Sequence, residues 1–353
     1  MENRHDFVKY LNNTDVTLNI FARLDAPADL IRATAVSHLW RHFVINQRLC
    51  KQLCLTKVPS MSNINAVFER EDEERNEHNP EWYHKMYSNL LSALSNSTIY
   101  PRNCIDCVIG ASSTNIYPPE SIVHTLLNTE RYALGGSYWS SRGQSDPDVP
   151  ETILYKLLNT VCIVNEIQIR PCKASWEQGS APYSAQFVRF RMGHPRSIAD
   201  FEVDVRTLPL QQLHDNYIWT FTSPEFPMAQ EPRMQTFKLP EPTICVGGFL
   251  QIEFLGRTRK REFDGLYYLC MSHIRVLGHS LWPAFDVEMS ETGDFSLIYC
   301  PENIDSILNR ITTKEEDLET NALMFGKNSS MAAHQTLDLL NITSLYYGLN
   351  LNP

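Results

Sequence analysis

Apolar residues near the start of the chain recur at helical spacing in three short runs. The runs are residues 15–24, 29–32 and 36–41, the last of which continues helically to about residue 59. This spacing predicts short helices, with Pro27 or Ala28 beginning the second and Ser37 capping the third. Because helices so short cannot enclose a sizeable core, we expect this segment to complete its core against another protein.

The next residues change in character and then return to a helical pattern. Residues 60–80 are charged and polar without apolar periodicity, most densely in 69–75. A charge run is usually a solvated face, so the pattern predicts an exposed linker or loop. From Pro80, apolar residues recur about every four positions to Leu94, which predicts one amphipathic helix.

After Pro101 the pattern is typical of β-strands. Residues 186–192 alternate between apolar and basic side chains, as in a half-buried antiparallel strand. Residues 249–255 and 267–276 flank a polar segment, and we interpret them as a hairpin. Short strands separated by Gly, Pro and Asn favour an antiparallel β-sandwich over a βαβ fold. Further strands are predicted at residues 104–110, 153–157 and 160–169.

The pattern weakens after residue 285. Apolar residues at positions 304, 307, 308 and 311 have the spacing of a helix, and residues 286–353 are otherwise assigned to a tail.

Composition and net charge argue against two classes of partner, nucleic acids and membranes. Hydrophobic residues at 43% and charged residues at 20% are typical of a folded protein. The net charge of −10 argues against general nucleic-acid binding, which requires a basic face. No apolar signal core follows the start, and no apolar run approaches the length of a membrane span. We therefore expect a soluble protein of the cytoplasm, the nucleus or both, without a membrane partner.

Candidate chemistry is sparse. The chain has nine scattered cysteines, an odd number that suits reduced, buried thiols. Cys104 and Cys107 have the spacing of half a zinc site, but no second pair follows, so we expect no metal. Residues 278–282 are similar to a nucleophile elbow around Ser280, except that Trp282 replaces the second glycine. We predict no catalytic residue and no cofactor, with a hydrolase using Ser280 as the alternative.

The basic run at residues 257–261 lies between two predicted strands. We interpret it as an exposed hairpin tip that charge keeps soluble, with nuclear import or anion binding as alternatives.

Residues 11–58 resemble the F-box, the short helical module by which substrate receptors attach to the Skp1-like adaptor of cullin–RING ubiquitin ligases. The residues that carry the resemblance are Asp15, Leu18, Ile20, Phe21, Leu24, Asp29, Leu30, Val36, Ser37, Trp40 and Arg41. One departure is Asn12-Asn13, where the family usually has Leu-Pro. The alternative is a small helical hairpin that packs only within this chain.

The resemblance implies a Skp1-like adaptor as a partner and, through it, a cullin. The residues expected to contact the adaptor are Asp15, Leu18, Ile20, Phe21, Leu24, Leu30, Ile31, Val36 and Trp40. Leu18, Ile20, Phe21 and Leu30 would seat in the adaptor's groove as a buried hot spot, with Trp40 bracing the helices behind them.

Residues 104–280 resemble a galactose-binding-like (discoidin-type) jelly roll. The segments that carry this resemblance are 111–113, 137–141, 153–157, 163–170 and 188–194. Loops at one end of such domains bind sugars, lipids or protein segments, which makes Tyr138, Trp139 and Arg142 the candidate target-binding residues. The alternative places Trp139 in the sandwich core, where large aromatic side chains usually lie.

Together the two resemblances indicate a plant F-box protein of multidomain α plus β class. The expected organisation is an F-box at 11–58, an acidic linker and connecting helix at 59–100, a β-sandwich at 104–285 and a tail at 286–353. The implied function is a non-catalytic substrate receptor of an SCF-type (Skp1–cullin–F-box) E3 ubiquitin ligase, whose sandwich recruits an unknown target protein. The alternative is an intracellular carbohydrate- or lipid-binding module.

Overall fold

The chain forms two compact units in a computed structural model. The described residues are 14–69, 79–127, 138–173, 181–196, 216–290 and 295–314. The helical unit contains residues up to 101, 241–244 and 281–314, and the sandwich unit contains the described residues of 102–240 and 245–280. Among the helices of these ranges, none combines the length and apolar character needed to cross a bilayer.

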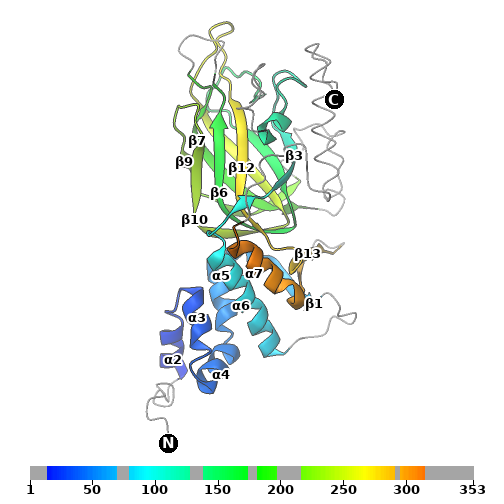
Figure 1. Ribbon diagram of the computed structural model, residues 1–353. Helices are drawn as coiled ribbons and strands as arrows, with labels where there is room; N and C mark the ends of the chain where they lie inside the picture. The colour runs from blue at the N-terminus through cyan, green and yellow to red at the C-terminus, as the bar shows by residue number, and fades with distance from the viewer. Residues whose placement is uncertain are drawn as a thin grey trace, which may run out of the picture. The chain divides into compact units, whose positions relative to one another are not determined.

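The helices of the helical unit follow the local signals of the sequence (Figure 1). They are α2 (Thr14–Phe21), α3 (Pro27–Ala33), α4 (His38–Asn46), α5 (Leu49–Lys57), α6 (Pro80–Asn96) and α7 (Ile304–Thr312), with 3-10 turns η1 (Pro59–Asn63) and η6 (Pro301–Asn303). Pro27 begins α3, and the Ser37 hydroxyl accepts the Trp40 backbone N–H at 3.3 Å, which confirms both predicted signals. The third predicted helix is divided into α4 and α5 by Arg48, whose φ is 50°.

A small sheet completes the helical unit. Its strands are β1 (Ile64–Glu69), β13 (Phe285–Met289) and β14 (Phe295–Tyr299), with β14 in the centre, parallel to β1 and antiparallel to β13. β1 corrects the interpretation of residues 60–80 as a linker or loop, although residues 70–78 lie outside the described residues. The sequence gives little local sign of this strand because its partner follows far along the chain.

The sandwich unit contains two antiparallel sheets. One has the order β10-β6-β12-β2 with β4 beside β12, and the other has the order β3-β5-β11-β7-β8 with β9 beside β7. Figure 1 shows β6 and β12 side by side in the first sheet. The strands are β2 (Arg102–Asn103), β3 (Ile105–Ala111), β4 (Trp139–Ser140), β5 (Glu151–Leu157), β6 (Val161–Pro171), β7 (Ala185–Pro195), β8 (Tyr217–Thr222), β9 (Phe226–Pro227), β10 (Gln235–Val246), β11 (Phe249–Arg257) and β12 (Cys270–Ser280).

The predicted hairpin of residues 249–255 and 267–276 is wrong. Both segments are strands, but β11 pairs with β5 and β7, whereas β12 pairs with β6, β2 and β4. Residues 258–269 therefore cross from one sheet to the other. A connection of this length exceeds the two to five residues of an ordinary hairpin loop, which favours the crossover.

The core of the sandwich lies between the two sheets and confirms the predicted jelly-roll class. Ile153, Phe190 and Ile252 come from one sheet and Ile169 and Ile274 from the other, and all are fully buried in one hydrophobic cluster. Inward-facing residues of both sheets thus share one interior, as expected for a sandwich.

Candidate functional site

The short helices at the start of the helical unit have an aromatic core of their own. Phe21 is 2% exposed, and its ring centroid lies 4.9 Å from that of Trp40, edge to face, and 5.4 Å from that of Phe43. Leu30 on α3 is 1% exposed. The ring contacts hold α2 against α4 and leave other apolar residues to face outward.

Four large apolar side chains within residues 14–46 are exposed: Val16 (42%), Ile20 (39%), Val36 (62%) and Leu39 (43%). We call these four the docking residues. Val16 and Ile20 are four positions apart on α2, so they share one face of that helix. Val36 precedes α4 and Leu39 lies in its first turn. Exposed apolar residues gathered in so short a segment are typical of an interaction surface.

The nine residues expected to contact an adaptor differ in exposure. Asp15, Ile20 and Val36 are exposed, whereas Leu18, Leu24, Ile31 and Trp40 are half-buried. Phe21 and Leu30 differ from expectation, because their surface is already buried within the chain. Val16 and Leu39 are also exposed but were not among the nine, although the four-residue spacing of Val16 and Ile20 was a signal for Val16.

The three candidate target-binding residues of the sandwich lie in different environments. Trp139 is fully buried, stacks on Phe254 at a centroid distance of 6.2 Å and donates its indole N–H to the Ser113 carbonyl at 3.1 Å. Its predicted alternative role in the core is therefore confirmed. Tyr138 is half-buried and donates its hydroxyl to Glu120 at 3.3 Å, while Arg142 is exposed. Burial and the Glu120 carboxylate raise the pKa of Tyr138, which stays protonated.

A buried ion pair lies at the end of β11. It corrects the interpretation of residues 257–261 as an exposed tip, because the first residue of that run is buried. Arg257 is 1% exposed, and its guanidinium lies 2.6 Å from the carboxylate of Glu151, which is 2% exposed. The guanidinium also donates to the Ser141 hydroxyl at 2.9 Å and to the backbone carbonyls of Arg142, Tyr267 and Val149. A buried charge is tolerated only with such complete pairing.

The crossover segment (residues 258–269) begins after this ion pair and presents a protruding aromatic side chain. Phe263 is 92% exposed. The segment beside it is braced: the Arg261 guanidinium binds Asp264 and lies 4.3 Å from the ring centroid of Tyr268, whose hydroxyl donates to Asp264 at 2.7 Å. The Arg261 guanidinium holds the pKa of Asp264 well below its usual range, so both charges persist at neutral pH.

Two further cations of the crossover segment lie over tyrosine rings. Arg259 lies over Tyr183 and Lys260 over Tyr267, each 5.0 Å from the ring centroid. Cation–π contacts of this kind favour a defined conformation of the basic side chains. The crossover segment thus holds ordered basic side chains near an exposed phenylalanine, together with the acidic Glu262 and Asp264.

The cysteines and Ser280, the other residues considered for chemistry, have structural surroundings. All nine cysteines are free and buried, and burial raises the pKa of Cys54 and of Cys107 to about 12. In the part of the chain that the structure describes, no three His, Cys, Asp or Glu side chains gather in a metal-binding group. Ser280 ends β12 and accepts a hydrogen bond from the Asn159 amide at 2.7 Å. A strand follows it instead of the helix that a nucleophile elbow requires.

Comparison with known proteins places this architecture in a family. Residues 14–56, which span α2 to α5, match the F-box-like family. Over 309 residues the chain is 41% identical to the F-box protein At4g00755 of Arabidopsis thaliana, a match that covers 83% of this chain and 81% of that protein. The chain belongs to the F-box protein family. The Arabidopsis match extends far beyond the F-box helices, so it includes most of the sandwich of this F-box protein.

Solved structures similar to this F-box protein at low sequence identity include carbohydrate-binding modules. The family 32 module of Clostridium perfringens NanJ, solved with galactose, is 9% identical with a TM-score of 0.32 and covers 50% of this chain and 98% of its own. A putative chitobiase fragment of Bacteroides thetaiotaomicron is 10% identical with a TM-score of 0.33, and the match covers 51% of this chain and 94% of that fragment. At such low scores the sandwich assignment rests on the strand pairing of this chain.

Proposed function

We propose that this F-box protein is the substrate receptor of an SCF-type ubiquitin ligase in the cytoplasm or nucleus. Its F-box helices would dock a Skp1-like adaptor, and its sandwich would hold a target protein. The observation that carries the proposal is the exposure of Val16, Ile20, Val36 and Leu39 on helices that match the F-box-like family. Apolar side chains in such positions lose water on docking and supply most of the binding free energy.

The contribution of this chain would be proximity. A target held by the sandwich and a conjugating enzyme held through the adaptor and a cullin react as if in one molecule, at a raised effective concentration. The ubiquitin chemistry would belong to that enzyme, so the receptor requires neither a catalytic residue nor a cofactor.

We assign target contact to the crossover segment. Phe263 is the protruding aromatic side chain, and aromatic anchors flanked by arginine are typical of binding hot spots. The ordered cations beside it favour a target pocket with an acidic rim. Among the residues expected earlier to contact a target, the exposed Arg142 can join this surface, while the buried Trp139 supports the sandwich. The carbohydrate- or lipid-binding alternative loses one of its aromatic candidates, because Trp139 is buried.

The adaptor step can be tested with the full-length protein and a purified Skp1-like adaptor. The double variant Ile20→Asp/Val36→Asp should lose co-purification with the adaptor, because a charge buried at an apolar interface is costly. Leu158→Asp is the matched control, since Leu158 is 46% exposed in the sandwich unit. Absence of adaptor binding by the unaltered chain would overturn the proposal, as would equal binding by the double variant.

The target step can be tested by proximity labelling in plant cells. Proteins that contact the crossover segment should be labelled by the unaltered chain and by the Ile20→Asp/Val36→Asp variant, but not by Phe263→Ser. Identical sets of labelled proteins for Phe263→Ser and the unaltered chain would refute the assignment of this surface.

A further inference from the structure

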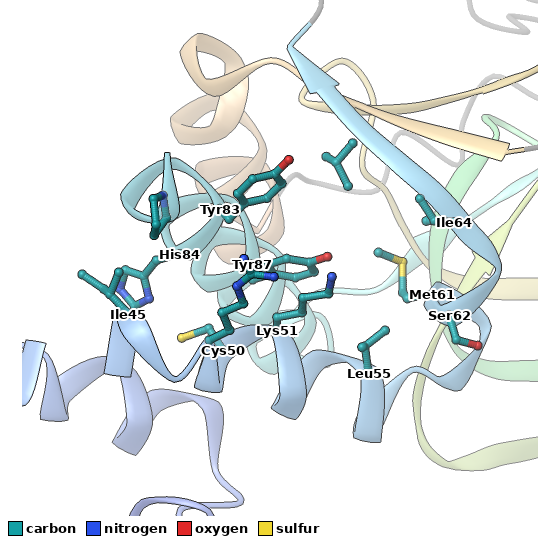
Figure 2. Close-up of a pocket in the computed structure, with 13 residues that line it drawn as sticks. Ile45, Cys50, Lys51, Leu55, Met61, Ser62, Ile64, Tyr83, His84 and Tyr87 are labelled. Carbon is teal, nitrogen blue, oxygen red and sulfur yellow. The ribbon is translucent and has the colours of Figure 1, made fainter. Parts of the chain in front are cut away.

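A cavity of about 350 Å³ lies within the helical unit, among α5, η1, β1 and α6 (Figure 2). We call it the α5–α6 cavity. Its apolar walls come from residues that include Leu55, Met61, Ile64 and Val67. Its volume falls within the range of roughly 300 to 1,000 Å³ that is common for small-molecule sites.

The charged side chains that line this cavity are positive, whereas the chain as a whole is negative. Arg48, Lys51 and His84 line it, and none of the described residues that line it is an Asp or Glu, although the chain has a net charge of −10. Neither Arg48 nor Lys51 has a carboxylate partner among the residues that the structure describes. The lysine ammonium lies 6.0 Å from the ring centroid of Tyr87.

The backbone places the arginine at the cavity. Arg48 lies between α4 and α5 with a φ of 50°, the left-handed conformation that non-glycine residues rarely adopt. Its backbone N–H is bound to the Ile45 carbonyl at 3.0 Å, which fixes the turn. Lys51 follows on α5, and Figure 2 shows the side chain of Lys51 beside Tyr87.

Neutral polar groups complete the lining. Burial and nearby groups raise the pKa of Tyr87, so its hydroxyl stays protonated and can donate a hydrogen bond. Burial, and then the charge of Arg41, lower the pKa of His84, which is therefore uncharged at neutral pH and can donate or accept. A ligand in the cavity thus meets two cations, the exposed Arg48 and the half-buried Lys51, with several neutral donors and apolar walls.

We propose that the α5–α6 cavity binds a small organic anion, with its acidic group at Arg48 and Lys51 and its aromatic or aliphatic body against Leu55, Met61 and Val67. The acidic group is a carboxylate, sulfonate or phosphate, because each pairs with guanidinium and ammonium groups. This site lies outside the docking residues and the crossover segment, so it is a function beyond the proposed receptor role.

The full-length protein can be titrated with the fluorescent probe anilinonaphthalene sulfonate, an aromatic anion, and with its uncharged analogue N-phenylnaphthylamine. The anionic probe should bind at one saturable site, more weakly as salt is added, and the uncharged analogue should bind much more weakly. The variant Arg48→Gln/Lys51→Gln should weaken binding of the anionic probe about tenfold or more, the effect of losing one strong charged contact.

The matched control is Arg23→Gln/Lys85→Gln, which removes two exposed cations outside the cavity lining and should leave the affinity unchanged. The Ile20→Asp/Val36→Asp variant should also bind the anionic probe normally, which separates this site from the docking residues. Circular dichroism verifies that each variant is folded. Equal affinity of both probes, an equal loss in the control variant or no saturable binding would each overturn the proposal.

Discussion

Arg257 and Glu151 form an ion pair of 2.6 Å between side chains that are almost completely buried. Glu151 begins β5 and Arg257 ends β11, and the two strands are antiparallel neighbours. The Glu151 carboxylate also accepts hydrogen bonds from the hydroxyls of Ser112 and Ser113. This pair therefore joins the end of β11, where the crossover segment begins, to the rest of the sandwich.

Removal of one partner of this pair should destabilise the sandwich strongly. We expect Arg257→Met to lower the free energy of unfolding by about 3 to 5 kcal/mol, because Glu151 would remain as an uncompensated buried charge. Chemical denaturation followed by circular dichroism measures this change. The exposed Arg142 supplies the control, Arg142→Gln, which should change stability by less than about 0.5 kcal/mol. A small effect of Arg257→Met would show that water reaches Glu151.

The division of the F-box helices into core and docking residues gives a second prediction. Phe21→Ala should destabilise the helical unit by about 3 to 5 kcal/mol, since it removes a ring packed on Trp40 and Phe43. Val36→Ala should leave stability nearly unchanged but weaken adaptor binding. Thermal unfolding and adaptor co-purification, measured on both variants, separate the two roles. Equal stability of the two variants would contradict the division.

Trp139 and Tyr138 are neighbours in sequence with different expected effects on substitution. Trp139→Ala should cost about 3 to 5 kcal/mol of stability, because it empties a fully buried site beside Phe254. Tyr138→Phe removes the hydroxyl that donates to Glu120 and should cost about 1 kcal/mol. Denaturation of the two variants checks this order. If the order were reversed, Trp139 would not be the core residue that its burial indicates.

Much of the fold could be predicted because its signals are local. Helical spacing, Pro27 and the Ser37 cap predicted the short helices, and strand-like segments predicted β3, β5, β6 and β7. Pairing across long stretches of chain could not be predicted in this way. β1 pairs with β14 through a distant parallel contact, and β11 and β12 separate into two sheets although they are consecutive.

The candidate site could be predicted only in outline. The resemblance to an F-box identified the docking segment, but exposure decides which apolar residues face outward, and exposure depends on packing. Phe21 and Ile20 are adjacent on α2, yet only Ile20 is exposed. The basic run of residues 257–261 combines the buried Arg257 with two half-buried arginines and the exposed Lys260. Composition alone does not tell the buried arginine from the other basic residues of the run, because Arg257 is paired with Glu151 on another strand.

Buried histidines give the last prediction, a dependence of stability on pH. His124 and His194 in the sandwich unit are 3% and 5% exposed, and burial lowers the pKa of both below the usual 6.5. The folded state therefore keeps them neutral, while the unfolded state takes up protons as the pH falls through that value. Their contribution to stability is fully present above the unfolded pKa and is lost progressively below it.

We accordingly expect the free energy of unfolding to fall between about pH 7.5 and pH 5.5, with a shallower slope in the variant His124→Gln/His194→Gln. Denaturant titrations at several pH values measure both slopes. The exposed His42 on α4 provides the matched control, since His42→Gln should keep the slope of the unaltered chain. If the double variant also kept that slope, the pH dependence would have to arise from other groups, and the two histidines would not be the buried neutral bases described above.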